Sequence, residues 1–161
     1  MTEPDVAASS APDSPTVPDT LARMDRGWAD FHGRVTSMPT EDLAARIGDD
    51  GWTRKQMLAH ITTWHDLAVD RLVRFADSGE PVVLTEDADV INARAGRAAE
   101  GRTIGEILLA MADSYRRFRR EVGTLTDEQL GAHAGWAAAI IAGNSFEHYA
   151  EHLPDLEASR R

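Results

Sequence analysis

The chain has 161 residues, a length that suits one domain with a sizeable core. Its formal net charge of −10 argues against nucleic acid or an anionic membrane as partner, since binding either needs clustered Lys and Arg. It has no cysteine, which excludes disulfides, thiolate metal sites and cysteine nucleophiles. No apolar run approaches the roughly 20 residues that span a bilayer, and no secretory signal is recognisable, so we expect a cytoplasmic protein without a membrane partner.

The N-terminal segment, residues 1–18, is rich in Pro, Ser, Ala and Asp. It cannot bury enough apolar surface to offset the entropy of ordering, so we predict a disordered tail. Residues 19–161 are predicted to form a single domain. Its first helix covers 19–36, with one of its first two residues as the cap, and a short helix follows at 41–47.

The strongest helical pattern starts after Gly51-Trp52. Thr53 and Gln56 form a capping box there, in which each side chain accepts from the other residue's backbone N–H. The apolar stripe that follows at helical spacing contains Met57, Ile61, Trp64, Ala68, Leu72 and Phe75. Gly79-Glu80-Pro81 is expected to end this helix.

A weaker helical pattern covers residues 87–99, as the start of a third long element that Gly101-Arg102 interrupts. Thr103 and Glu106 form a second capping box, after which apolar residues recur at helical spacing. This pattern predicts the third long helix of the domain.

A third capping box introduces a short helix at about 127–132, and the last helix is expected over 136–158. Pro154 lies within it, which predicts a kink or break near Leu153. No segment shows sustained alternation with β-branched residues, so we predict an all-α fold, a four-helix bundle with short extra helices.

Three histidines are the candidate site. His148 and His152 are four residues apart, which places them one turn apart on the same face of a helix, and His60 borders the apolar stripe of the strongest helix. Together they can hold one metal ion, and imidazole suits Zn, Ni, Fe and Cu. The alternative is a set of packed or exposed histidines. Asn144, one turn before His148, is either a contact to the site or a surface amide.

The segment Trp52-Thr53-Arg54-Lys55-Gln56-Met57-Leu58-Ala59-His60-Ile61-Thr62-Thr63-Trp64 resembles the second-helix signature of the DinB-like superfamily. In that signature an aromatic residue precedes a capped helix, Leu-Ala-His-Ile or a similar run follows, and a second aromatic lies one turn on. The His-x-x-x-His pair on the last helix, His148 and His152, resembles the other mark of the superfamily.

This resemblance implies a four-helix bundle with one divalent metal (Zn, Ni or Fe) held by His60, His148 and His152. The superfamily includes mycothiol-dependent maleylpyruvate isomerase-like proteins, thiol-dependent S-transferases and a ClbS–DfsB-like branch. In the isomerases the first ligand of the last-helix pair is typically Glu, whereas this chain has His148. The sequence also shows no second domain of the isomerase type, and both departures argue against the specific isomerase reaction. The segment Asn144-Ser145-Phe146-Glu147-His148-Tyr149-Ala150-Glu151-His152 looks most like the ClbS–DfsB-like branch or a close relative.

Two functions follow as expectations from the resemblance. The first is a metal-dependent enzyme that activates a low-molecular-weight thiol such as mycothiol, or water, for transfer to, isomerisation of, or hydrolysis of a small electrophilic molecule. The second is a non-catalytic protein that binds a small molecule or sequesters it for self-resistance. Either function has a small molecule as partner, and the resemblance also suggests a homodimer.

Other histidines and aromatic residues are weaker candidates. His65 is predicted to be exposed, because it lies well around the helix from the first histidine, and His32 and His133 have no partner at a ligand spacing. Trp64 and Tyr115 can line a pocket beside the metal, although core packing explains each of them as well.

Overall fold

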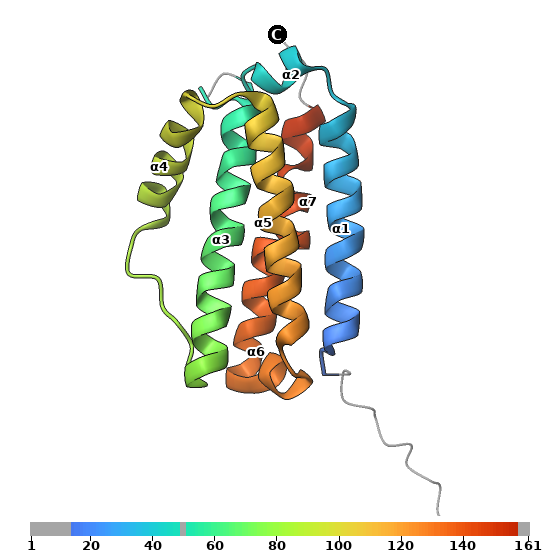
Figure 1. The fold of residues 1–161 in the computed structure, drawn as a ribbon, viewed down its shortest axis with the longest axis vertical. Coiled ribbons are helices and arrows are strands. Elements are labelled where there is room, and N and C mark those ends of the chain that lie inside the picture. The colour runs from blue at the N-terminus through green and yellow to red at the C-terminus, as the bar shows by residue number, and fades with distance from the viewer. Residues whose placement is uncertain (1–13, 49–50, 158–161) are drawn as a thin grey trace, which may run out of the picture.

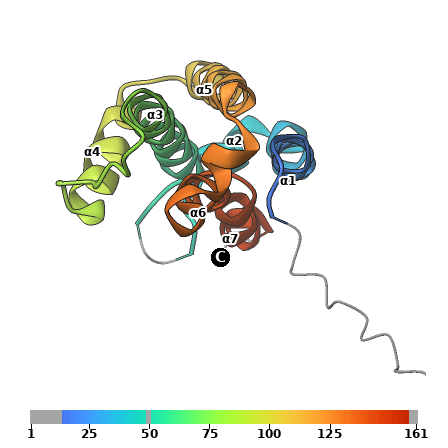
Figure 2. The ribbon, with the colours of Figure 1, turned by 90° about the horizontal axis from the view of Figure 1, so that it is seen from below.

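The computed structural model describes residues 14–48 and 51–157, and these ranges fold into helices with no strand among them. The helices are α1 (Val17–Ser37), α2 (Thr40–Ala44), α3 (Arg54–Ser78), α4 (Ala88–Glu100), α5 (Ile104–Thr124), α6 (Asp127–Asn144) and α7 (Phe146–Glu157). α1, α3 and α5 run lengthwise, and α6 and α7 follow each other end to end as the fourth member of the bundle (Figures 1 and 2). The predicted all-α four-helix bundle is therefore confirmed.

α1 begins two residues earlier than the sequence suggested. Its cap is Thr16, whose side chain accepts from the backbone N–H of Asp19, and Val17 and Pro18 form the first turn. Proline is favoured there because the first helical N–H groups have no partner within the helix. Residues 1–13 of the predicted tail lie outside the described residues.

α3 confirms the pattern read from its sequence. The Thr53–Gln56 capping box is present, and Gly79 ends the helix with φ +75°, a left-handed conformation that glycine adopts without strain. The buried core that α3 shares with the other bundle helices is apolar; its largest fully buried side chains include Phe31, Phe75, Phe118, Met24, Met57, Leu58, Ile61, Leu72 and Met111. This core holds α3 rigidly beside the last helices.

α4 is a separate helix and not the start of the third bundle member, so that expectation is wrong. Figures 1 and 2 show it outside the four-helix core, beside α3. Its narrow apolar face, which includes Ile91, Ala95 and Ala99, is buried, and Gly96 lies against Trp52. A helix with so few large apolar residues can cover one neighbour but cannot fill the centre of a bundle.

The last predicted helix is broken at a place that the sequence did not reveal. The expected interruption between the short helix and residue 136 is present, because the backbone leaves helical geometry at 132–135. A second break comes at Ser145 (φ −131°, ψ −109°), whose hydroxyl donates to the carbonyl of Ile141. Pro154, by contrast, lies inside α7 without ending it. Because proline has no backbone N–H, the carbonyl of Ala150 has no donor within the helix. Ala150 is exposed, so water can solvate this carbonyl.

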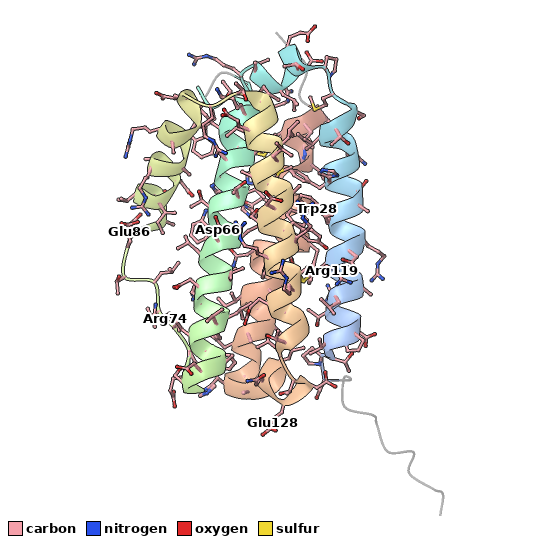
Figure 3. The ribbon with its side chains drawn as sticks, viewed as in Figure 1. Trp28, Asp66, Arg74, Glu86, Arg119 and Glu128 are labelled. Atoms are coloured by element: carbon pink, nitrogen blue, oxygen red, sulfur yellow. The ribbon has the colours of Figure 1, made fainter. Side chains whose placement is uncertain are left out.

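Ion pairs across the surface join neighbouring helices. Arg119 of α5 makes a two-bond contact with Asp25 of α1, and Arg117 pairs with Asp66 of α3. Figure 3 shows Arg119 on the side of α5 that faces α1, and Asp66 on α3. No helix within the described ranges is both long and apolar enough to cross a membrane.

Candidate metal centre

The structure brings His60, His148 and His152 together. α3 supplies His60 and α7 supplies the other two, and one ring nitrogen from each lies within 4.8 Å of those of the other two. The ring centroids are 4.9 Å apart for His60–His148, 5.2 Å for His60–His152 and 4.9 Å for His148–His152. This near-equilateral group, on two facing helices, could hold a metal ion.

The tautomer of His60 follows from its neighbours. Asn92 of α4 presents Oδ1 to both Trp64 Nε1, at 2.8 Å, and His60 Nδ1, at 2.9 Å. An indole N–H can only donate, so the Asn92 atom is the oxygen, and His60 Nδ1 must donate to it as well. The Nε2 atom of His60 therefore carries a lone pair, and it points at His148 Nε2, 2.9 Å away.

His152 is oriented in the same way. Its Nδ1 lies 2.8 Å from Asp155 Oδ2, one turn further along α7, and an ionised carboxylate can only accept. Its Nε2 is thereby free to act as a ligand. Hydrogen bonds from the remote ring nitrogen to a carboxylate or carbonyl are what metal-ligating histidines usually have.

His148 differs from the other two. Its Nδ1 is the one buried side-chain nitrogen or oxygen within the described ranges that has no hydrogen-bond partner. The nitrogen of His148 that faces His60 is Nε2, so the orphaned Nδ1 is the remote one, and no side chain orients this ring as Asn92 and Asp155 orient the other two.

Burial keeps the imidazoles of His60 and His148 neutral. Loss of solvent lowers the pKa of His60 to about 4, helped by the nearby His152 and opposed by the hydrogen bond that His60 donates to Asn92. Loss of solvent also lowers the pKa of His148 to about 3, helped by His60 and His152. A neutral imidazole is the form that binds metal, so these two side chains can act as ligands at neutral pH without first losing a proton.

The group opens onto a pocket of about 520 Å³, a size that suits a small molecule. Beyond the three histidines it is lined by Trp64, Asn92, Ala139, Ile140, Gly143, Asn144 and Glu151. Glu151 is exposed, and no lysine or arginine among residues 14–48 and 51–157 belongs to the lining. The walls therefore combine apolar side chains with imidazole, amide and carboxylate groups.

The structure separates the two aromatic candidates. Trp64 lines the pocket, and its ring meets that of His60 at 6.3 Å with an edge-to-face angle of 71°. Tyr115 lies elsewhere, stacked on Trp28 at 4.2 Å and donating to Asp25. The core alternative stated for Tyr115 is thus the correct one.

The prediction that His65 is exposed is wrong. Its side chain is 0% exposed, with Nδ1 at 2.8 Å from Ser114 Oγ and Nε2 at 2.6 Å from Tyr149 Oη. α3 is covered by other helices on more than one side, so a residue away from its main apolar stripe still meets protein. His32 stacks on Trp28 at 4.7 Å, away from the metal candidates.

Two further residues at the site were not singled out from the sequence. Asp155 follows His152 by three residues, a spacing that would have indicated contact on a helix. Asn92 had no such signal, because only the packing of α4 on α3 brings it to His60. Asn144 is buried, lines the pocket and donates to the carbonyl of Ile140, so it is no surface amide.

Fold and site together define a class: four-helix bundles in which three imidazoles from two helices gather at an open pocket. The model of the DinB superfamily matches residues 23–154, and the chain belongs to this superfamily. None of the curated protein sequences compared with the chain matches it.

Solved structures show the same fold at low sequence identity. A structure named "Sibling Lethal Factor Precursor - DfsB" is similar with a TM-score of 0.76 and 14% identity, over 90% of this chain and 95% of that one. An uncharacterised protein from Escherichia coli UTI89 gives 0.74 and 14%, over 93% and 94%. A protein from Streptococcus pneumoniae gives 0.74 and 11%, over 92% of each chain.

Proposed function

We propose that His60, His148 and His152 hold one divalent metal ion, Zn, Ni or Fe, in a metal-dependent enzyme of the DinB type. The enzyme would activate a low-molecular-weight thiol such as mycothiol, or water, towards a small electrophilic molecule. The observation that carries this proposal is the convergence of the three imidazoles at an open pocket, with the remote nitrogens of two of them already hydrogen-bonded. We place this site in a DinB-like domain formed by residues 19–161.

The chemistry at this centre is metal-assisted nucleophile activation. When bound, a divalent ion lowers the pKa of a coordinated thiol or water and so supplies a nucleophile at neutral pH. Asn92 and Asp155 hold two of the imidazoles with their Nε2 lone pairs directed inward. Because the chain has no cysteine, any thiol must come from a second molecule. A cytoplasmic setting, where such thiols stay reduced, suits this proposal.

The pocket restricts which electrophile can enter. Trp64 and Ile140 offer apolar contact, and the amides of Asn92 and Asn144 offer hydrogen bonds. Within the part of the chain that the structure describes, no lysine or arginine lines the pocket to pair with a substrate carboxylate. These walls favour an uncharged substrate, and the reaction on it would be transfer, isomerisation or hydrolysis.

A second candidate function is binding without catalysis, in which the protein sequesters a small molecule. The observation that favours it is the partly apolar pocket with neutral imidazoles at its base. Under this alternative, metal-free protein would bind an apolar ligand as well as untreated protein does.

The test is elemental analysis of untreated protein and of two histidine variants. We expect one equivalent of a divalent metal in the wild type, loss of it in His148→Ala, and retention in His133→Ala, whose side chain is exposed and contacts the carbonyl of Gly79. The same metal content in His148→Ala and wild type would refute the site.

Assays of the loaded protein with 1-chloro-2,4-dinitrobenzene, with and without mycothiol, separate thiol transfer from hydrolysis. Product that forms only with mycothiol indicates transfer, and product without it indicates activated water. A loaded protein that binds ligand but turns over no electrophile in either assay favours the sequestering function.

A further inference from the structure

Two side-chain contacts connect α3 with α7. Their residues are five positions apart on α3 and adjacent on α7. The first is His60 to His148, with their Nε2 atoms 2.9 Å apart. The second is His65 to Tyr149, with Nε2 and Oη 2.6 Å apart. The first contact belongs to the candidate metal centre, whereas the second is buried in the core and has no role in the function proposed above.

The hydrogen atoms of the second contact can be assigned. The single hydroxyl hydrogen of Ser114 is directed at the carbonyl of Met111, 2.9 Å away, so Ser114 Oγ accepts from His65 Nδ1. His65 Nε2 therefore accepts from the hydroxyl of Tyr149. Burial lowers the pKa of His65 to about 3, so the ring stays neutral and this donor order holds at neutral pH. The chain of bonds fixes Tyr149 of α7 to α3 and α5.

His148 needs help of this kind more than the other two histidines do. His60 and His152 are oriented by Asn92 and Asp155, whereas the Nδ1 of His148 has no partner. The backbone offers little help from upstream, because α7 starts afresh after the break at Ser145 and is only 12 residues long. The position of His148 must therefore be set by what holds its own turn of helix.

We propose that Tyr149 and His65 are positioning residues of the metal centre, holding the first turn of α7 against α3 so that His148 meets His60. This inference rests on the proposed metal site. In a purely structural role, the buried hydroxyl of Tyr149 and the imidazole of His65 would only satisfy each other's hydrogen bond. A positioning role instead makes the metal affinity depend on the Tyr149 hydroxyl, although this group contacts neither the metal nor its three histidines.

Tyr149→Phe tests the inference, with Tyr115→Phe as the matched control. Both variants remove one tyrosine hydroxyl from the interior, but Tyr115 donates to Asp25 on α1, and Asp25 keeps both bonds from Arg119. The probe is cobalt(II), titrated into protein freed of metal by a chelator and followed by its visible absorption. Tyr149→Phe is expected to bind cobalt about tenfold more weakly, as for the loss of other groups that orient a ligand. Tyr115→Phe is expected to lose thermal stability while keeping the affinity and spectrum of the wild type.

The outcomes are distinct. A wild type that binds no cobalt refutes the metal site, and this inference with it. A wild type and Tyr149→Phe of equal affinity and spectrum refute the positioning role alone, as do equal losses in both tyrosine variants. If Tyr149→Phe does not fold, as judged by circular dichroism, Ser114→Ala takes its place, because it removes the acceptor of His65 Nδ1 from α5. Unchanged affinity in a folded Ser114→Ala then refutes the inference.

Discussion

The buried imidazole of His65 is expected to make the protein sensitive to mild acid. Its pKa is about 3 in the folded chain, against 6.5 for the free side chain, because burial opposes the charged form. Above pH 6.5 the His65 imidazole is neutral in both the folded and the unfolded chain, so its contribution to stability is then fully present. As the pH falls below 6.5, His65 becomes protonated in the unfolded chain but stays neutral in the folded chain. The free energy of unfolding therefore drops by about 1.4 kcal/mol per pH unit. Between pH 7 and pH 5 the loss is about 2 kcal/mol.

The measurement compares the wild type with His65→Gln, an amide that can still donate and accept but does not titrate. Urea unfolding followed by circular dichroism, with a chelator present throughout, gives the free energy of unfolding at each pH. The variant is expected to be less stable at pH 7 by about 1–3 kcal/mol, because an amide fits the bonds to Ser114 and Tyr149 imperfectly. It should then lose about 2 kcal/mol less than the wild type between pH 7 and pH 5. His60 and His148 are present in both proteins and cancel in the comparison. Parallel curves for the two proteins would refute the reasoning.

Two further predictions concern α1 and α4. A Cβ at Gly27 would lie 2.8 Å from the Cβ of Phe146, whereas a Cβ at Gly33 would meet nothing within 4 Å. Thermal unfolding should therefore show that Gly27→Ala is destabilised by about 1–3 kcal/mol through overpacking. Gly33→Ala should be stabilised by up to about 1 kcal/mol, because alanine favours the helix more than glycine does. Melting temperatures that rise in both variants would contradict this prediction. Asn92→Ala, which removes the partner of His60 Nδ1, should weaken metal binding by about 10–100-fold in a chelator competition, and an unchanged affinity would show that the ring is held by packing alone.

Local signals explain why the helices could be predicted from the sequence. The three capping boxes that start α3, α5 and α6 are all formed, because each depends on residues only three positions apart. The apolar stripe of α3 is buried except at Trp64, which lines the pocket, since helical spacing alone decides which side chains share a face. His60, His148 and His152 were chosen partly by this logic, and the structure does bring them together.

Features that depend on a packing partner could not be read in this way. His65 was placed on a solvated face, but Ser114 and Tyr149, distant in sequence, form a polar niche around it. The contact of Asn92 with His60 could not be predicted for the same reason, because it depends on the packing of α4 against α3. The break at Ser145 had no proline or glycine at the position itself, and its hydroxyl bond to the backbone one turn earlier is a weak signal in any sequence.

The peripheral place of α4 separates two tasks within the chain. The four-helix core keeps its packing through α1, α3, α5 and the last two helices, while α4 lies outside and contributes Asn92 to the wall of the pocket (Figure 2). Because Asn92 both lines the pocket and orients His60, a change in how α4 lies against α3 would alter the pocket and the position of this histidine together, while the four-helix core stays as it is.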